Sequence, residues 1–277
     1  MRNAGKRMTA WLLAVLVLLG GLGMTACEEQ TAVSMTVDVL KIGKADCIVI
    51  DTGKSLIMID TGEAENLPTI HSYMRNHQYE AIDLLILTHY DKDHIGGAAS
   101  IISEYRVETV IEPPNPSGRS EYEQYHAALS EKGQSALAPT EDQSFTYDGC
   151  VFEINVPKKK RYAKKNENNS SLIVSVRCGE RGFLFCGDAM ELRLDEWLAT
   201  SAAQYDFVKL PYHGNYLENY GAFLDAVKPQ CVAITDSKRN PTATQTRNML
   251  SERGIGIYCT QYGQIHAESD GKSLNVQ

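Results

Sequence analysis

Four side chains that commonly bind metal ions follow an apolar run of the sequence. The run, residues 84–87, has the pattern of a buried strand, and it leads to His89, Asp91, Asp93 and His94. Because open α/β sheets place their chemistry at the carboxyl ends of strands, we expect these donors to face one small volume. Such a cluster indicates one or two divalent ions. The alternative is a helix N-terminus capped by Asp93, but a cap needs one acceptor and leaves the other three donors unexplained.

The segment T-H-Y-D-K-D-H-I-G-G, residues 88–97, resembles the metal motif of the metallo-β-lactamase-fold hydrolases. Its His-x-Asp-x-Asp-His spacing is similar to that of the hydrolase domain of ComEC-type competence proteins. Further likeness extends from about residue 35 to the end of the chain. The resemblance implies an α/β fold, the four-layer αβ/βα sandwich, formed by one domain of residues 35–277. It also implies a metal-dependent hydrolase.

Two later segments complete the ligand set that the resemblance implies. Gly187-Asp188 is similar to a family motif whose aspartate bridges two metals. Residues 211–214 resemble a Pro-His-His-Gly segment, with Tyr212 in place of the first histidine, so of its two histidines only His213 is kept. The implied donors are His89 and Asp91 for one ion and Asp93, His94 and His213 for the other, with Asp188 between them. The predicted catalytic residues are Asp93 and Asp188. The oxygen-rich first site shifts the preference toward Mn²⁺ and leaves Zn²⁺ open.

Other polar segments are candidates for supporting or substrate-binding roles. Asp60 resembles a family aspartate near the metal loop and is a predicted partner of a ligand histidine; a strand-end turn former is the alternative. Asn168 and Asn169 stand where histidine-rich relatives supply another ligand. Residues 158–165 hold six cations, and an isolated charge run is usually a solvated loop. Here the run leads into the asparagines, so we expect it to overhang the site and attract phosphate through Lys158, Lys160 and Arg161.

Alternating β and α patterns along the chain are expected to position these groups. Strands are predicted at residues 35–42, 45–51, 55–60, 107–111, 172–177, 182–186, 207–212 and 230–235, with a hairpin at 145–156 and a terminal β segment at 256–276. Helices are predicted at residues 66–77, 95–105, 121–131, 190–199, 219–227 and 242–253. This alternation fits a sandwich with helices on both sides of a split sheet, and it indicates no second domain.

The N-terminus has an export pattern. Three basic residues precede an apolar run at residues 11–19, and small residues lead to Cys27. Residues 24–27 resemble a bacterial lipobox, which implies a signal peptide of residues 1–26, lipidation of Cys27 and a tether at residues 27–34. An uncleaved anchor is the alternative, although the run is shorter than the roughly 20 residues that span a bilayer. We therefore expect an extracytoplasmic, membrane-anchored lipoprotein of a bacterial envelope.

The composition fits a globular body with an acidic surface. The chain has 277 residues, 43% of them hydrophobic, and a net charge of −8; loss of the three basic residues before the apolar run leaves 24 basic against 35 acidic residues, or −11. Such a charge argues against non-specific coating of nucleic acid. Six cysteines follow Cys27, an even number that permits disulfides after export, but their apolar neighbours favour packing in the core without crosslinks. No protein partner is indicated.

Two functions of different classes are compatible with these residues. The first is a metal-dependent hydrolase that cleaves phosphodiesters, in nucleic acid or in an envelope polymer, with an activated water. The second is a binding protein that keeps the fold without turnover, which Asp91, Tyr212 and Asn240 indicate because fuller family patterns have histidine there. The sequence lacks a Gly-x-Ser-x-Gly motif and a Cys/His nucleophile signature, which argues against covalent catalysis. The incomplete histidine set argues against a β-lactamase.

Overall fold

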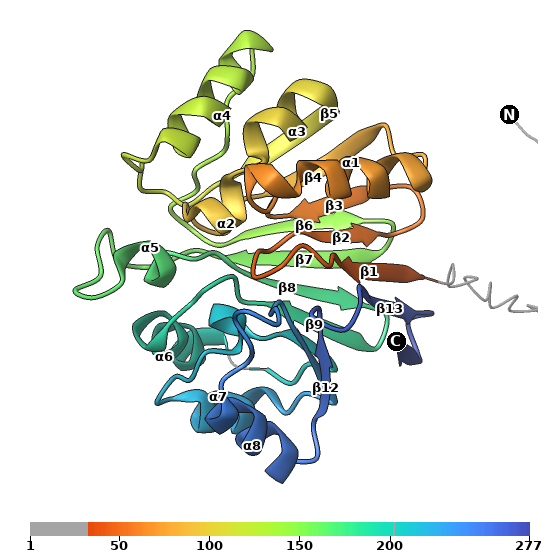
Figure 1. Ribbon diagram of the computed structural model, residues 1–277, viewed down its shortest axis with the longest axis vertical. Helices are drawn as coiled ribbons and strands as arrows, with labels where there is room; N and C mark the ends of the chain where they lie inside the picture. The colour runs from red at the N-terminus through yellow and green to blue at the C-terminus, as the bar shows by residue number, and fades with distance from the viewer. Residues whose placement is uncertain (1–32, 202) are drawn as a thin grey trace, which may run out of the picture. The chain divides into compact units, whose positions relative to one another are not determined.

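The computed structural model describes residues 33–201 and 203–277, and two mixed sheets form the centre of this part of the chain (Figure 1). The first sheet has the strand order β14 (Leu274–Val276), β13 (Ile265–Ser269), β1 (Met35–Val39), β2 (Ile48–Asp51), β3 (Leu56–Ile59), β4 (Ala81–Ile86) and β5 (Arg106–Ile111). The second has the order β12 (Gly256–Cys259), β11 (Cys231–Ile234), β10 (Phe207–Lys209), β9 (Arg181–Phe185), β8 (Ile173–Cys178), β7 (Cys150–Asn155) and β6 (Gln143–Tyr147).

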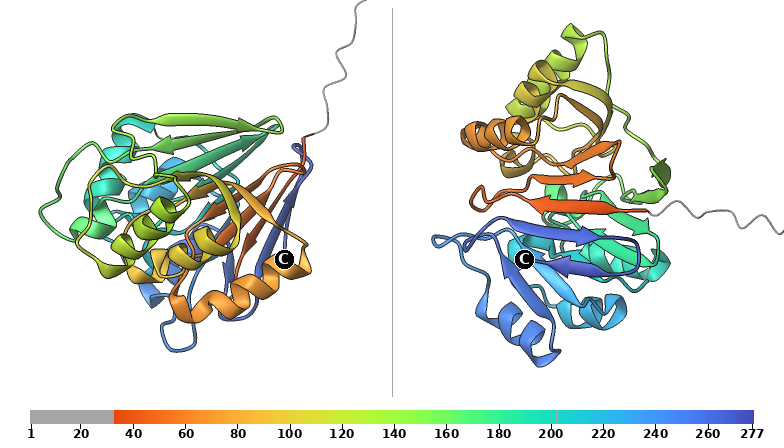
Figure 2. Two further views of the ribbon diagram at one scale, coloured as in Figure 1. Left: turned by 90° about the horizontal axis from the view of Figure 1, so that it is seen from above. Right: turned by 90° about the vertical axis from the view of Figure 1, so that its right-hand side faces the viewer.

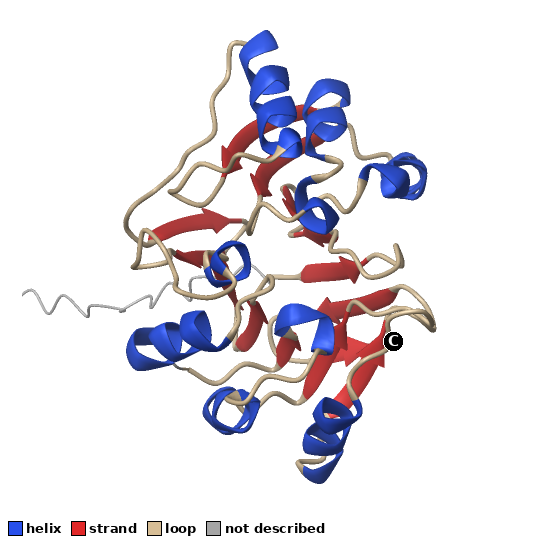
Figure 3. Ribbon diagram, turned by 60° about the vertical axis from the view of Figure 1, so that its left-hand side comes forward, coloured by secondary structure: helices blue, strands red, loops and turns tan. Residues whose placement is uncertain are grey.

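Helices cover the outer face of each sheet, so the layers are helix, sheet, sheet and helix (Figures 1 and 3). The helices against the first sheet are α1 (Leu67–Asn76), α3 (Ala98–Glu104) and α4 (Ser120–Glu131). Those against the second sheet are α6 (Glu191–Ser201), α7 (Tyr220–Val227) and α8 (Thr244–Glu252). Four short helical segments lie in loops: α2 (Lys92–Ile95), α5 (Asn166–Asn169), η1 (Ala64–Asn66) and η2 (Pro211–Gly214). The predicted four-layer αβ/βα sandwich is confirmed.

The core between the sheets forms because alternate residues of each strand point toward the facing sheet. Val37 and Ile50 from the first sheet and Phe152 and Val176 from the second are among its fully buried members. Each such side chain stabilises the fold by about 1.5–3 kcal/mol. The right-hand view of Figure 2 shows strands in the middle, with helices above and below them.

The carboxyl ends of parallel strands from both sheets carry the loops of interest. In the first sheet, β4 pairs in parallel with β3 and β5. In the second sheet, β10 pairs in parallel with β9 and β11. Ligand-bearing loops gather at this end of parallel strands because the crossover connections return the chain to the opposite end.

Three element predictions need correction. The predicted helix at residues 95–105 is two helices, α2 and α3, because the Gly96-Gly97 pair separates them and the first begins inside the predicted ligand loop. The terminal β segment is divided between the sheets, with β12 in the second and β13 and β14 in the first. The short helix α5 was not predicted. Its four residues are too few to show a helical repeat.

The preference for uncrosslinked cysteines is wrong for one pair. Cys150 and Cys178 form a disulfide between β7 and β8, where they are directly opposite in the antiparallel register. Sequence spacing cannot reveal such a pairing because it depends on which strands become neighbours. The other cysteines of the described ranges, Cys47, Cys186, Cys231 and Cys259, are free and buried, as expected of core residues.

Within the described residues, none of the helices combines the length and the apolarity that a bilayer crossing requires. The predicted signal peptide at residues 1–26, the lipidation site at Cys27 and most of the tether at residues 27–34 lie outside the described residues. The first described strand, β1, begins at Met35, where the predicted domain begins.

Candidate metal centre

The loop after β4 supplies four of the predicted donors. His89 and His94 are fully buried, whereas the carboxylates of Asp91 and Asp93 keep 23% and 20% of their side-chain surface exposed. The centroids of the two imidazole rings are 4.0 Å apart. The chain turns sharply here because Asp91 is extended and α2 begins at the next residue, which brings both imidazoles to one side. The loop therefore offers two buried nitrogen donors with two carboxylates at their outer edge.

The second sheet supplies the other two predicted donors. Asp188 follows β9, and His213 lies in η2 directly after β10. One Asp188 oxygen, Oδ1, lies 3.5 Å from His94 Nε2, and the other, Oδ2, lies 3.2 Å from His213 Nε2. His213 Nε2 is also 3.5 Å from Asp93 Oδ2. Asp188 thus lies between histidines of the two sheets, at the place where the resemblance implied a bridging carboxylate.

The structure brings all six predicted ligands together, and their unpaired atoms fit a metal ion. The Nε2 atoms of His89, His94 and His213 and the Oδ1 atom of Asp188 are buried without a hydrogen-bond partner among the described residues. Buried polar atoms without partners are costly, so such a group is expected to bind something else. A mixed set of imidazole and carboxylate donors suits Zn²⁺, which favours imidazole, and Mn²⁺, which favours carboxylate. That these residues bind metal remains a prediction.

The opposite nitrogen of each imidazole is held by a neighbour. His94 Nδ1 is 2.7 Å from Asp60 Oδ2, the contact predicted for Asp60. His213 Nδ1 is 2.9 Å from Thr235 Oγ1, and His89 Nδ1 is 3.1 Å from Thr88 Oγ1. Because these contacts fix the ring orientation, they leave each Nε2 available to an ion.

The charges of the cluster depend strongly on one another. Burial raises the pKa of Asp188, but His213 and His94 outweigh it and hold the pKa well below its ordinary value. Burial lowers the pKa of His94, but Asp188, Asp60 and Asp46 raise it well above 6.5. The pKa of His213 is raised in the same way, chiefly by Asp188 against the effect of burial. The carboxylates therefore remain ionised and create a strong local preference for cations.

Asn168 and Asn169 have different surroundings although they are adjacent in α5. Asn168 Nδ2 lies 3.4 Å from Asp91 Oδ2 and 3.4 Å from Asp188 Oδ2, so its side chain is at the cluster. Asn169 instead donates to the carbonyl of Lys164 at 2.9 Å and accepts from the backbone N–H of Arg193 at 3.0 Å. Asn168 can therefore act on the cluster directly, whereas Asn169 holds the loop that carries it.

The basic run is less closely connected with the cluster than the sequence predicted. Lys158 pairs with Asp142, 2.5 Å away on the segment that leads into β6, so its ammonium is directed elsewhere. Lys160 and Arg161 are exposed, and Arg161 lines an open hollow of about 610 Å³ together with Asn166 of α5. The helix α5 follows the basic run directly, and its Asn168 lies at the cluster.

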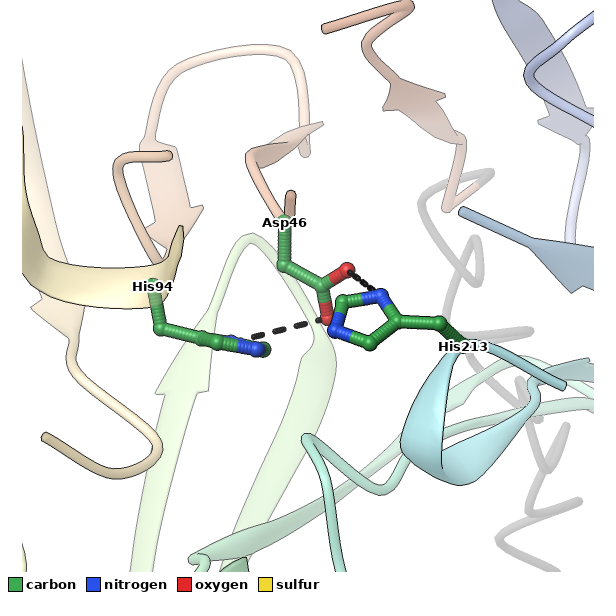
Figure 4. Close-up of side chains that lie close together, drawn as sticks. All are labelled: Asp46, His94 and His213. Carbon is green, nitrogen blue, oxygen red and sulfur yellow. Dashed lines mark ion pairs between the residues drawn. The ribbon is translucent and has the colours of Figure 1, made fainter. Parts of the chain in front are cut away.

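Sequence reasoning missed several polar residues at the cluster. Asp46 lies between His94 and His213 (Figure 4), and buried Lys209 contacts its carboxylate. A lysine inside the apolar segment 207–210 is a signal that could have been used, since lysine is almost never fully buried without a partner. Arg119, which precedes α4, contacts Asp91. The sequence contains no comparable signal for Arg119.

The comparisons agree with this geometry. The family model for the metallo-beta-lactamase superfamily matches residues 41–233. The chain is 28% identical over 205 residues to Recombination protein 2 of Haemophilus influenzae, covering 73% of this chain and 23% of that protein. It is 22% identical over 223 residues to ComE operon protein 3 of Bacillus subtilis, covering 74% of this chain and 28% of that protein. It therefore spans about a quarter of the length of these relatives.

A solved structure supports the fold independently. The metallo-beta-lactamase fold protein YhfI of Bacillus subtilis superimposes with a TM-score of 0.60 at 13% identity, covering 86% of this chain and all of that one. At this identity the likeness concerns the fold alone. The family match extends over more than half of the sequence, and six donors of the family's motifs meet where the two sheets face each other. The chain belongs to the metallo-beta-lactamase superfamily and, within it, is ComEC-like.

Proposed function

We propose that this protein is a metal-dependent hydrolase that cleaves phosphodiesters, in nucleic acid or in a cell-envelope polymer. The observation that carries the proposal is the group of buried Nε2 atoms and the Asp188 oxygen that lack partners and face one another. Superfamily membership supports hydrolytic chemistry. The relative named Recombination protein 2 favours nucleic acid as the substrate.

The clustered residues would have different roles in such a reaction. His89, His94, His213, Asp91, Asp93 and Asp188 would hold one or two divalent ions, Zn²⁺ or Mn²⁺. A bound ion supplies Lewis acidity and an activated water. Asp93, partly exposed beside buried His213, is placed to accept a proton from the attacking water. Asp188 lies between His94 of the first sheet and His213 of the second, within 3.5 Å of both, and would complete the ligand set.

Arg119 supports a phosphate-bearing substrate. Its guanidinium keeps 40% of its side-chain surface exposed and lies at Asp91, on the outer edge of the cluster. A planar guanidinium can donate two parallel hydrogen bonds to a phosphate, which makes arginine well suited to this substrate class. The basic run at residues 158–165 adds positive charge near α5, although Lys158 is paired with Asp142.

A second candidate function is binding without turnover. It is favoured by the contact between Arg119 and Asp91, because a carboxylate that is paired with a guanidinium is a weaker metal ligand. Tyr212 replaces a family histidine next to His213 and would supply no strong ligand. In this case the protein would bind phosphate esters and release them unchanged.

An assay with bis(p-nitrophenyl) phosphate separates the two candidates. We expect hydrolysis that requires Mn²⁺ or Zn²⁺, stops with chelator and is lost in His94→Ala. His266→Ala is the matched control, since His266 contacts Asp38 in β1 and lies outside the cluster. Metal uptake without hydrolysis of this ester, single-stranded DNA or a polymeric phosphodiester would establish the binder instead.

We also propose that the protein is an extracytoplasmic lipoprotein. The Cys150–Cys178 disulfide supports this location, because disulfides persist in oxidising compartments. The lipobox-like segment that ends at Cys27 supports a lipid anchor. In a bacterial host, the protein should fractionate with membranes and Cys27→Ser should shift it to the soluble fraction. Equal membrane retention of the wild-type protein and of Cys27→Ser would contradict lipidation of Cys27.

A further inference from the structure

Asp46 and Lys209 form a buried ion pair beside the predicted metal ligands. Lys209 is fully buried, and its Nζ contacts Asp46 Oδ2, lies 3.2 Å from the Gly187 carbonyl oxygen and 3.9 Å from Asp188 Oδ1. Burial disfavours the charged form of each group. The charge of each group stabilises the charged form of the other, and the result is a raised pKa for Lys209 and a lowered pKa for Asp46. The proposed metal function does not use this pair.

Asp46 lies on the side of the imidazoles that faces away from the predicted ion. Its oxygens are 3.8 Å from His94 Nδ1 and 3.5 Å from His213 Nδ1 (Figure 4). Asp188 is the residue that faces the corresponding Nε2 atoms. The carboxylate therefore lies on the Nδ1 side of both rings, whereas Asp188 lies on the Nε2 side.

Asp46 and the two histidines are close enough to resemble a metal site of their own. Two features argue against an ion there. Both Nδ1 atoms are already engaged, by Asp60 at 2.7 Å and by Thr235 at 2.9 Å. The Lys209 ammonium already supplies the positive charge that Asp46 requires. The lysine thus takes the place that an ion would need.

The pair also joins the two sheets. The Asp46 N–H donates to the Asp93 carbonyl at 3.0 Å and its own carbonyl accepts from the Gly62 N–H at 2.8 Å, which fixes Asp46 to the ligand loop of the first sheet. Lys209 ends β10 in the second sheet, in register with Phe185 of β9 and Ala233 of β11. Those two strands lead to Asp188 and to Thr235, the partner of His213.

We propose that the Asp46–Lys209 pair is a positioning device that sets the separation of the metal ligands of the two sheets, and that neither residue is itself a ligand. The inference rests on the proposed metal function. One sheet provides His89, Asp91, Asp93 and His94, and the other provides Asp188 and His213. Removing the pair lets the two groups move apart and weakens ion binding. A buried pair contributes little net stability, so its main effect is on geometry.

The test compares wild type with Asp46→Asn, Lys209→Met and the double variant Asp46→Asn/Lys209→Met. Each single variant leaves a buried charge without its partner and should lower the thermal midpoint sharply. The double variant removes both charges and should recover most of the midpoint. Its affinity for Zn²⁺ or Mn²⁺, measured by competition with a chromogenic chelator, should remain roughly ten- to a hundredfold below wild type.

A matched control and two opposing outcomes complete the test. Arg181→Met/Asp206→Asn removes another ion pair of the second sheet, with its atoms 3.0 Å apart, and should keep wild-type metal affinity. Wild-type affinity in the double variant overturns the proposal. Loss of one bound ion from folded Asp46→Asn also overturns it, because Asp46 would then be a ligand.

The same measurements distinguish failure of the positioning role from failure of the proposed function. If the metal function is wrong, the wild-type protein takes up no ion; if only the positioning role is wrong, wild type and the double variant bind ions equally. Should the double variant be folded but too unstable for the competition assay, the rise of its thermal midpoint with added metal replaces that assay. A smaller rise than that of wild type supports the proposal, and an equal rise overturns it.

Discussion

At the scale of single residues, three histidines share one arrangement, although His89 and His94 come from the loop after β4 and His213 comes from the segment after β10. Each Nδ1 contacts an oxygen of a different neighbour, from Asp60, Thr88 or Thr235. The Nε2 atoms are consequently buried, oriented and free of partners. Orientation by such contacts lowers the entropic cost of binding an ion, since the rings do not need to be ordered at that moment.

Substitution of Arg119 tests whether the substrate is a phosphodiester. Arg119→Ala should lower kcat/KM for a phosphodiester on the order of a hundredfold, because it removes the exposed guanidinium beside Asp91. Metal affinity should stay the same or rise, since Asp91 loses a competing cation. Steady-state kinetics and chelator competition measure both quantities.

Arg106→Ala is the control for this prediction. Arg106 is 75% exposed, and among the described residues its one ion pair is with Glu108 on its own strand. A fall in metal affinity with unchanged turnover of the loaded protein would show that Arg119 supports the ligands rather than the substrate.

At the scale of elements, the turns after the strands have unusual backbone conformations at the cluster. Asp60, Tyr212 and His213 have φ values of 60°, 52° and 51°, which non-glycine residues rarely adopt. Such strain persists only where the surroundings impose it, and it concentrates at functional sites. At His213 it lets η2 direct the imidazole toward Asp188 directly after β10 ends.

Substitution of Gly187 tests whether the turn that carries Asp188 is needed for stability and for metal binding. Its φ is +51°, and a Cβ there would lie 2.8 Å from Thr88 Oγ1 and 2.9 Å from Thr88 Cβ. Thr88 in turn contacts Asp60 and His89. Gly187→Ala should therefore lower the free energy of unfolding by about 2–5 kcal/mol, the sum of the overpacking cost and the left-handed backbone cost, and also weaken metal binding.

The control for this change is Gly133→Ala. Gly133 has a similar φ of +67°, but an added Cβ would meet no atom within 4 Å. Gly133→Ala should lower the free energy of unfolding only by the cost of the left-handed conformation, about 1–2 kcal/mol, and should leave metal affinity unchanged. Urea denaturation and chelator competition give both values. Equal metal affinity in the two variants would contradict a role for this turn.

At the scale of the whole molecule, the candidate site lies where two sheets meet, so ion binding and folding are coupled. The first sheet carries four donors and the second carries two, and an ion bound to both groups links them. An ion that binds only the folded protein stabilises it by mass action. Thermal stability therefore reports ion binding directly.

The pH dependence of this stabilisation has a definite sign. The raised pKa values of His94 and His213 stabilise the chelator-treated protein fully below pH 6.5, and this contribution is lost as the pH rises through the raised values. Metal binding needs neutral imidazoles and strengthens over the same range. The lowered pKa of Asp188 has no effect here, since its contribution is lost only in acid.

We therefore expect the difference in thermal midpoint between metal-loaded and chelator-treated protein to widen as the pH rises above 6.5. Thermal denaturation at a series of pH values measures it. His213→Ala should reduce the widening, because it removes both a ligand and a titrating group. A difference that stayed constant or narrowed with pH would contradict ion binding by these histidines.

The sequence, through its resemblance to a known family, predicted the layers and named the six side chains that the structure brings together; that they bind metal stays a prediction. The apolar run that ends at His89 is a local pattern, whereas Asp188 and His213 were named on the resemblance. Asp60, predicted as a partner of a ligand histidine, contacts His94. The basic run was interpreted less well, since composition shows charge but not the direction in which Lys158 points.

The tertiary structure alone decided which distant residues meet. The Cys150–Cys178 bond, the Arg119–Asp91 contact and the Asp46–Lys209 pair each join segments that are neighbours only after the strands and sheets have packed. A sequence determines which face of an element is apolar through the helix and strand repeats. It does not show which buried charge will find which partner, because that depends on the register of strands and on the distance between two sheets.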